Sequence, residues 1–119
     1  MAMTIHTVSA DCRNAWKLAH FWAALLDWTV DDDNAEGDDE VGITPRVDGP
    51  APLLFIEVSE PKAIKNRIHL DLKPDDQAAE VERALALGAM RTDVGQTGDE
   101  SWVVMSDPEG NEFCILKSG

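Results

Sequence analysis

The sequence of 119 residues lacks any long apolar run. Its longest such run covers residues 21–26, whereas a membrane-spanning helix needs about 20 apolar residues. The first residues, Met-Ala-Met-Thr, lack the basic and apolar regions of a secretory signal. We therefore expect a cytoplasmic protein that has no membrane partner.

Basic residues are scarce, with 10 lysines and arginines against 23 aspartates and glutamates, which gives a net charge of −13. A surface of this charge repels nucleic acid and anionic lipid. We expect no nucleic-acid partner, and we interpret the acidic surface as an aid to solubility. Hydrophobic residues still make up 44% of the chain, which is enough for a folded core.

Cysteines are also few, and several catalytic motifs are missing. Cys12 and Cys114 have no CxxC spacing, so we expect two buried free thiols rather than a disulfide framework or a cysteine-rich zinc site. The chain has no Ser-His-Asp order, phosphate-binding loop, Gly-x-Gly-x-x-Gly or HExxH sequence. These absences count against hydrolases, nucleotide-binding proteins and zinc proteases.

The first half of the chain has the pattern of a strand, a helix and three more strands. Residues 4–10 are rich in β-branched side chains and predict a strand, and residues 15–26 predict a helix with Asn14 as its N-cap. Trp22 lies on the apolar stripe of that helix, so we assign it to the core. The acidic residues 31–40 predict an exposed loop. Further strands are expected at residues 28–30, 41–47 and 53–58.

The second half repeats this order after a polar connector at residues 60–66. Residues 67–72 predict a strand, and residues 73–87 predict a helix that ends at Gly88. The Asp-Pro-Glu-Gly-Asn sequence at residues 107–111 predicts a turn. Three further strands are expected at residues 89–93, 101–105 and 112–117, with a Gly-rich turn at residues 94–100.

The order β-α-β-β-β therefore occurs twice, which predicts an α+β fold. We expect one domain, residues 1–119, made of module one at about residues 3–60 and module two at about residues 66–118. Two such modules can form a curved mixed sheet around a cleft, with the helices outside. The halves share little sequence beyond two Ile-His pairs, Ile5-His6 and Ile68-His69.

Three stretches of the chain carry a family resemblance. The first is Asp-Cys at residues 11–12 followed by Leu-Ala-His-Phe-Trp-Ala-Ala-Leu-Leu at residues 18–26. The second is Lys-Asn-Arg-Ile-His-Leu-Asp-Leu at residues 65–72, and the third is Ser-Asp-Pro-Glu-Gly-Asn-Glu-Phe-Cys-Ile-Leu at residues 106–116. Together they resemble the bacterial glyoxalase-like group of the vicinal oxygen chelate superfamily (glyoxalases, bleomycin resistance proteins and dioxygenases). The resemblance covers nearly the whole chain.

Metal-dependent members of this superfamily hold a divalent ion with one side chain from each of the first, fourth, fifth and eighth strands, and the ion acts as a Lewis acid. The resemblance places His69 at the fifth-strand position and Cys114 at the eighth, where the family has glutamate. Measured back from the helix, the first-strand position is Thr7, and the fourth-strand position is Ile56. A hard divalent ion is poorly served by these four side chains, so we predict a degenerate metal site with no cofactor.

A different strand register gives a different set of ligands. Matching the two Ile-His pairs puts His6 at the first-strand position, and a slip of one residue puts Glu57 at the fourth. His6 and Glu57 with His69 and Cys114 would suit zinc. This alternative therefore implies a divalent metal, which could be zinc, nickel, manganese or iron.

His69 is the candidate catalytic residue, as a general base or hydrogen-bond donor. Asp71 lies on the same strand face and could orient it. Trp102 is the best candidate for stacking on a ligand, although core packing or a dimer contact is an equal interpretation. Lys65 and Arg67 could attract an anionic ligand, but pairing with neighbouring acids is the simpler interpretation. The predicted substrate-binding residues are Thr7, Ile56, His69, Asp71, Trp102 and Cys114.

Three functions are open at this point. The first is a glyoxalase-like protein that binds a small molecule at a degenerate metal site, with or without metal-free acid–base chemistry at His69. The second is a metal-dependent lyase, isomerase or dioxygenase, and the third is a non-catalytic interaction or dimerisation module with a filled cleft. Members of the superfamily commonly pair, so the resemblance also implies a homodimer.

Overall fold

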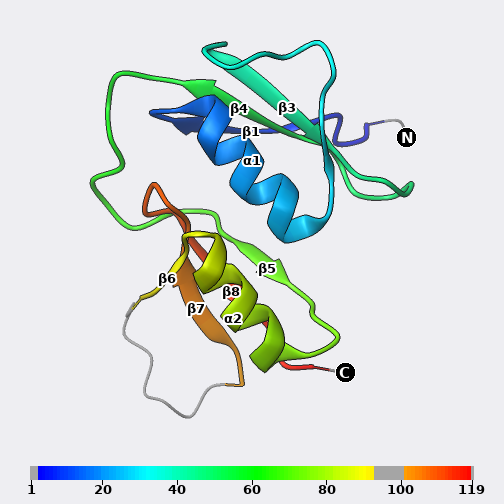
Figure 1. The fold of residues 1–119 in the computed structure, drawn as a ribbon, viewed down its shortest axis with the longest axis vertical. Helices are drawn as coiled ribbons and strands as arrows, with labels where there is room; N and C mark the ends of the chain where they lie inside the picture. The colour runs from blue at the N-terminus through cyan, green and yellow to red at the C-terminus, as the bar shows by residue number, and fades with distance from the viewer. Residues whose placement is uncertain (1–2, 93–100, 119) are drawn as a thin grey trace. The chain divides into compact units, whose positions relative to one another are not determined.

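A computed structural model describes residues 3–92 and 101–118 of the chain. The chain divides into two compact units, Met1–Pro61 (module one) and Lys62–Gly119 (module two), and the division falls inside the connector expected at residues 60–66. Each module contains one helix and one four-stranded mixed sheet, so the predicted α+β fold of two βαβββ modules is confirmed (Figure 1). That the two modules surround a common cleft stays a prediction.

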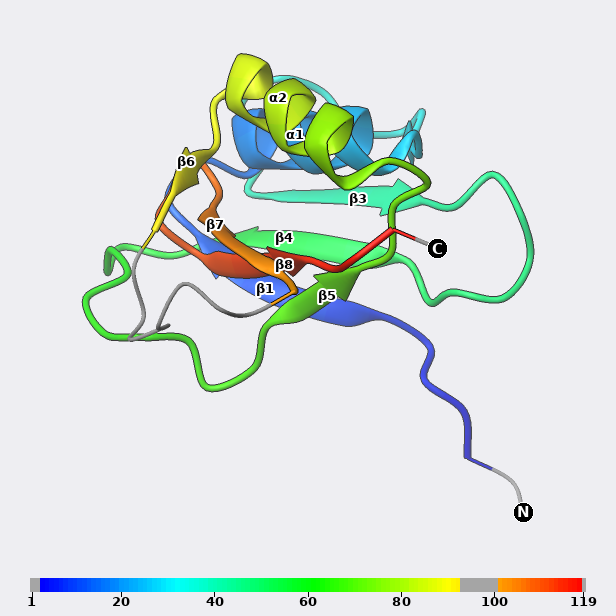
Figure 2. The same cartoon turned by 90° about the horizontal axis from the view of Figure 1, so that it is seen from below.

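Module one follows the predicted order of a strand, a helix and three strands. Its elements are β1 (Val8–Cys12), α1 (Ala15–Leu26), β2 (Thr29–Val30), β3 (Glu40–Thr44) and β4 (Leu53–Glu57). The strand order in the sheet is β1-β4-β3-β2, with β1 parallel to β4 and the other neighbours antiparallel. Figure 2 shows α1 lying along one face of this sheet.

The helix α1 has the predicted bounds, and it begins where a cap is available. The Asn14 side chain accepts a hydrogen bond from the backbone N–H of Lys17 at 3.1 Å, which satisfies one of the donors left unpaired in the first turn. The apolar stripe of α1 packs on β3 and β4, where Ile43 and Phe55 are buried. Trp22 is buried as well, so its assignment to the core is confirmed.

Module two repeats the order with shorter strands. Its elements are β5 (Leu70–Leu72), α2 (Gln77–Leu87), β6 (Met90–Arg91), β7 (Val103–Ser106) and β8 (Glu112–Ile115). The strand order is β5-β8-β7-β6, with β5 parallel to β8 and the others antiparallel. Over the residues that the structure describes in both modules, no helix has the length and apolar character needed to cross a bilayer.

Because side chains alternate along its strands, the sheet in module two has two different faces. Successive side chains of a strand point to opposite faces, so the paired residues of β5, β7 and β8 sort into two sets. One set packs with the buried Val81 and Ala84 of α2 and forms the core of the module. This set is Leu70, Leu72, Val103, Met105, Phe113 and Ile115. The opposite set forms the face away from α2.

The starts of two strands differ most from the prediction. The first was placed at residues 4–10, but its pairing with β4 covers Val8–Cys12 and starts where the Val8 N–H donates to the Pro52 carbonyl. The fifth was placed at residues 67–72, but only its last three residues pair with β8. A β-branched composition therefore predicted strands beyond the reach of a partner.

The start of α2 and the turn before β8 can also be compared with the prediction. The helix α2 begins at Gln77 rather than at residue 73, because the Asp76 side chain caps it by accepting the Ala79 N–H at 3.1 Å. The predicted turn at residues 107–111 is confirmed, since Asp107 Oδ1 accepts two backbone N–H groups of that turn. The Gly-rich turn expected at residues 94–100 lies outside the described residues.

The residues that cap the C-termini of the two helices both have a left-handed backbone conformation, but one is an aspartate and the other a glycine. The C-cap of α1 is Asp27 (φ 58°), and the C-cap of α2 is Gly88 (φ 116°). A Cβ at Gly88 would meet Pro108 Cγ only at an ordinary 3.5 Å, so the cost of Gly88→Ala is backbone strain. We expect Gly88→Ala to lower the free energy of unfolding by about 1–2 kcal/mol in urea denaturation.

The matched substitution is Asp27→Gly, which removes left-handed strain instead of adding it. It also removes an exposed ion pair with Arg46 that contributes little. We expect the free energy of unfolding to stay level or rise by up to about 1 kcal/mol. Equal losses in the two variants would contradict the conformational explanation.

Candidate functional site

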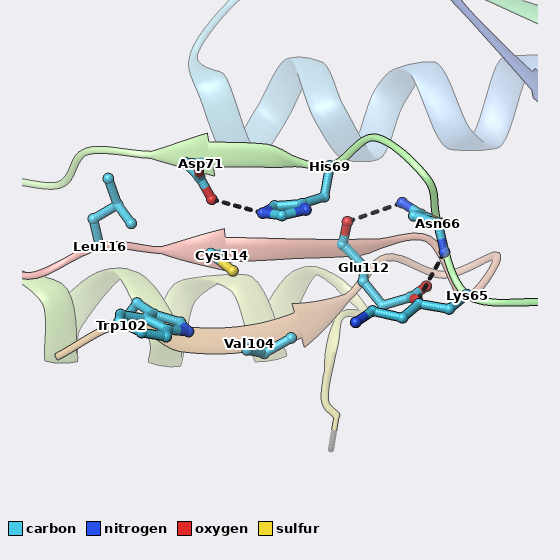
Figure 3. A pocket seen from close by; sticks show the side chains of 9 residues that line it. All are labelled: Lys65, Asn66, His69, Asp71, Trp102, Val104, Glu112, Cys114 and Leu116. Carbon is cyan, nitrogen blue, oxygen red and sulfur yellow. Dashed lines mark hydrogen bonds and ion pairs between the residues drawn. The ribbon is translucent and has the colours of Figure 1, made fainter. Parts of the chain in front are cut away.

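The face of module two that points away from α2 holds a cavity of about 350 Å³. This volume is near the lower end of small-molecule sites, which span about 300–1,000 Å³. All of its lining lies within module two, so the site needs no assumption about module one. The lining residues are Lys65, Asn66, His69, Asp71, Trp102, Val104, Glu112, Cys114 and Leu116 (Figure 3).

The sheet register explains why these residues converge. Asp71 of β5 and Val104 of β7 are both direct partners of Cys114 on β8, so the three side chains lie in a row across the open face. Residues two positions away along each strand extend the same face. Glu112 and His69 join the row in this way on one side.

His69 and Asp71 form the most polar part of the cavity wall. His69 Nε2 lies 3.1 Å from Asp71 Oδ1, and the two side chains are 49% and 51% exposed. A carboxylate at this distance favours one orientation of the imidazole ring. The pair thus has the geometry that an orienting role of Asp71 would need. That role, and ligand binding at the second ring nitrogen, stay predictions.

Cys114 lies beneath this pair and is only 8% exposed. Burial raises the pKa of its thiol above the ordinary 9.0, and the charge of Asp71 and a hydrogen bond to it raise the pKa further. The thiol is therefore protonated at neutral pH and donates to the carboxylate. Such a thiol is a poor nucleophile.

Glu112 ties the chain that precedes His69 to the sheet. Its carboxylate lies 2.7 Å from Lys62 Nζ, and the Asn66 backbone N–H donates to its Oε1 at 3.1 Å. The Asn66 side chain donates in turn to the Glu112 carbonyl at 3.1 Å. Burial alone would raise the pKa of Glu112, but the hydrogen bonds from Lys62 and Asn66 outweigh it and lower that pKa.

Three side chains could share a metal ion. One ligand atom from each of His69, Asp71 and Cys114 lies within 4.8 Å of the other two. A nitrogen, an oxygen and a sulfur suit a borderline ion such as zinc better than a hard one. Metal binding requires a thiolate, however, while burial and Asp71 keep the thiol protonated. The donor types fit zinc, but the Cys114 thiol carries a proton that metal binding would have to displace.

The other predicted site residues lie in module one. Ile56 is opposite Asp11 and Glu40 in the sheet, on the face that does not carry the buried Phe55, and Glu57 follows on the other face. Thr7 and His6 both precede β1. The structure thus brings together His69, Asp71, Trp102 and Cys114. A shared site with Thr7 and Ile56, or with His6 and Glu57, stays a prediction.

Sequence reasoning missed part of the lining. Counting two residues in each direction from Cys114 would have found Glu112 and Leu116, and counting from Trp102 would have found Val104. Asn66 has no comparable signal, because its place depends on the contact with Glu112.

The matching family settles the class of protein. Residues 7–116 match the sequence model of the glyoxalase-like domain. The chain belongs to the glyoxalase-like domain family, within the vicinal oxygen chelate superfamily. No match is found among curated proteins.

Solved structures of this superfamily have the same fold. An enzyme of the glyoxalase/bleomycin resistance protein/dioxygenase family from Burkholderia phytofirmans is 21% identical, with a TM-score of 0.68 over 92% of this chain and 94% of that one. TnmS3, an antibiotic binding protein from Streptomyces sp. CB03234, is 18% identical, with a TM-score of 0.68 over 100% and 99%. A mutant of the fosfomycin resistance protein FosX from Listeria monocytogenes, complexed with Mn(II) and 1S,2S-dihydroxypropylphosphonic acid, is 12% identical, with a TM-score of 0.73 over 100% and 93%.

The lowered pKa of Glu112 predicts a pH-dependent stability. Because the folded pKa lies below the ordinary 4.5, the folded state binds fewer protons, so the stabilisation is complete above about pH 4.5 and declines as the pH falls through the folded pKa. Near pH 7 we expect Glu112→Gln to lower the free energy of unfolding by about 2 kcal/mol, and the difference from the native protein should narrow toward about pH 3. Urea denaturation across this range measures both quantities.

The matched control is Glu82→Gln, which removes the same charge from an exposed position on α2. It should leave the pH dependence of the native protein intact. A gap between Glu112→Gln and the native protein that stays constant with pH would contradict the ion-pair explanation.

The raised pKa of Cys114 predicts its reactivity. Asp71→Asn removes the negative charge that disfavours the thiolate, so the pKa of the thiol should fall. In a Cys12→Ala background, we expect iodoacetamide to alkylate the Asp71→Asn variant roughly fivefold faster at about pH 8. Asp75→Asn, an exposed change in the same module, should leave the rate unchanged, and an unchanged or slower rate in Asp71→Asn would refute the assignment.

Proposed function

We propose that this protein binds a small organic molecule in the cavity of module two and that His69 hydrogen-bonds to it or exchanges a proton with it. The proposal needs no resident metal. The observation that carries it is the half-exposed His69–Asp71 pair on the wall of an open cavity of about 350 Å³. A histidine held by a carboxylate beside a cavity has the geometry of a general base or acid.

The contacts of His69, Asp71 and Cys114 suggest a different role for each residue. Asp71 holds one nitrogen of His69, which leaves the other nitrogen to donate to a ligand or accept a proton from it. Cys114 lies next to the pair and adds no charge to the cavity, because its thiol stays protonated. Proton transfer at near-neutral pH is therefore assigned to the imidazole rather than to the sulfur.

The structural neighbours support a small-molecule occupant. One is described as an antibiotic binding protein, and another was solved with a small phosphonic acid. An open cavity also favours this function over a non-catalytic interaction module, which requires a filled site. These likenesses support a class of occupant and not its identity.

A metal-dependent lyase, isomerase or dioxygenase is the second candidate, and the convergence of His69, Asp71 and Cys114 favours it. These three residues would hold the ion, which in the FosX neighbour is Mn(II). A bound divalent ion would supply Lewis-acid stabilisation of negative charge on a substrate oxygen. The protonated state of Cys114 is the reason for ranking this function second.

A thermal-shift screen of small molecules tests the first proposal. At about 100 times its Kd, a true ligand should raise the Tm of the native protein by roughly 10 °C. The shift should disappear in His69→Ala and persist in His6→Ala, which removes a histidine outside this cavity. Equal loss in both variants would overturn the assignment of the site to module two.

Elemental analysis tests the second candidate on the same variants. The protein would be incubated with zinc, nickel, manganese or iron(II), then desalted. About one ion per chain, lost in both His69→Ala and Cys114→Ser, would replace the metal-free proposal. Loss in His6→Ala as well would favour the alternative register of the first strand.

A further inference from the structure

Building on the proposed function, we infer that the cavity selects an anionic small molecule, whose carboxylate, phosphonate or sulfonate group lies between Lys65 and Trp102. The two side chains approach the same part of the cavity, next to Val104, from opposite ends (Figure 3). Both present hydrogen-bond donors and no acceptor.

Both acids of the lining have partners within the protein. The Asp71 carboxylate lies 3.1 Å from His69, and the Glu112 carboxylate lies 2.7 Å from Lys62. A cationic ligand would therefore have to compete with these partners for either carboxylate. A ligand can pair more readily with a charge of the lining that has no partner in the described part of the protein.

That charge is on Lys65. Within the described part of the chain, its ammonium has no hydrogen-bond or ion-pair partner. Figure 3 shows the side chain running back along the cavity, with its nitrogen directed toward Val104 rather than toward the carboxylate of Glu112. A lysine ammonium in this position offers three donors to an oxyanion.

Trp102 completes the arrangement from the other end. Its indole nitrogen faces Val104 in Figure 3 and has no partner among residues 3–92 and 101–118. The indole N–H only donates, so it favours an acceptor and offers nothing to an amine. The residue is 44% exposed, and its ring lies near Leu116, so an apolar part of the ligand can rest there.

The net charge of −13 does not select an anion at long range, because it repels one. Selection must therefore act at short range, where charge-assisted hydrogen bonds are made. At physiological ionic strength the repulsion is screened beyond about 8 Å, whereas charge-assisted hydrogen bonds act at about 2.7–2.9 Å. The two donors can thus decide which molecules bind.

Three naphthalene compounds of nearly the same shape test this inference. They are naphthalene-2-carboxylate, its neutral carboxamide and the cation of 2-(aminomethyl)naphthalene. We expect the carboxylate to bind about tenfold more tightly than the carboxamide, and the cation to bind most weakly, in titrations followed by ¹H–¹⁵N NMR. The indole N–H signal of Trp102, identified by its loss in Trp102→Phe, should move with the carboxylate.

A pair of lysine variants isolates the charge. Lys65→Gln should abolish the preference for carboxylate over carboxamide while the carboxamide still binds. Lys17→Gln removes the same charge from an exposed position on α1, outside the cavity, and should keep the preference.

The outcomes separate the inference from the function on which it rests. If the carboxamide or the amine binds at the cavity as tightly as the carboxylate, and His69→Ala abolishes that binding, the inference is overturned and the proposed function stands. If no compound of any charge perturbs the signals of the cavity residues, both are overturned.

Discussion

The pairing of β8 with its two neighbours is the constraint on which module two depends. Phe113 faces the helix, while Glu112 and Cys114 on either side of it face the cavity. A slip of one residue would place the phenyl ring in the cavity and the carboxylate in the core, at a large cost in free energy. The core and the site are therefore specified by the same register, and neither can change without the other.

Charge in the cavity is organised by short contacts and not by the overall charge of the chain. Glu112 binds Lys62 and Asn66, which fixes the segment that leads into His69. Asp71 is shared by the imidazole above it and the thiol beneath it. An acidic protein can therefore contain a cavity in which both carboxylates have partners, while the ammonium of Lys65 has none among the described residues.

Part of this arrangement could be predicted from the sequence. The bounds of α1 followed from a capping asparagine and a helical apolar stripe, both of which are local signals. The alternation along β5 and β8 was enough to place His69 with Asp71. The starts of β1 and β5 were wrong, because a strand ends where its partner ends and composition does not report the partner. The direction of the Lys65 side chain had no local signal in the sequence.

The protonated thiol of Cys114 also bears on how the cavity withstands oxidants. Oxidation of cysteine to sulfenic acid proceeds from the thiolate, so burial and the adjacent carboxylate slow it. A glutamate at this position would be inert to peroxide but would carry a charge. Cys114 instead gives this part of the cavity a side chain that is neutral, compact and slow to oxidise.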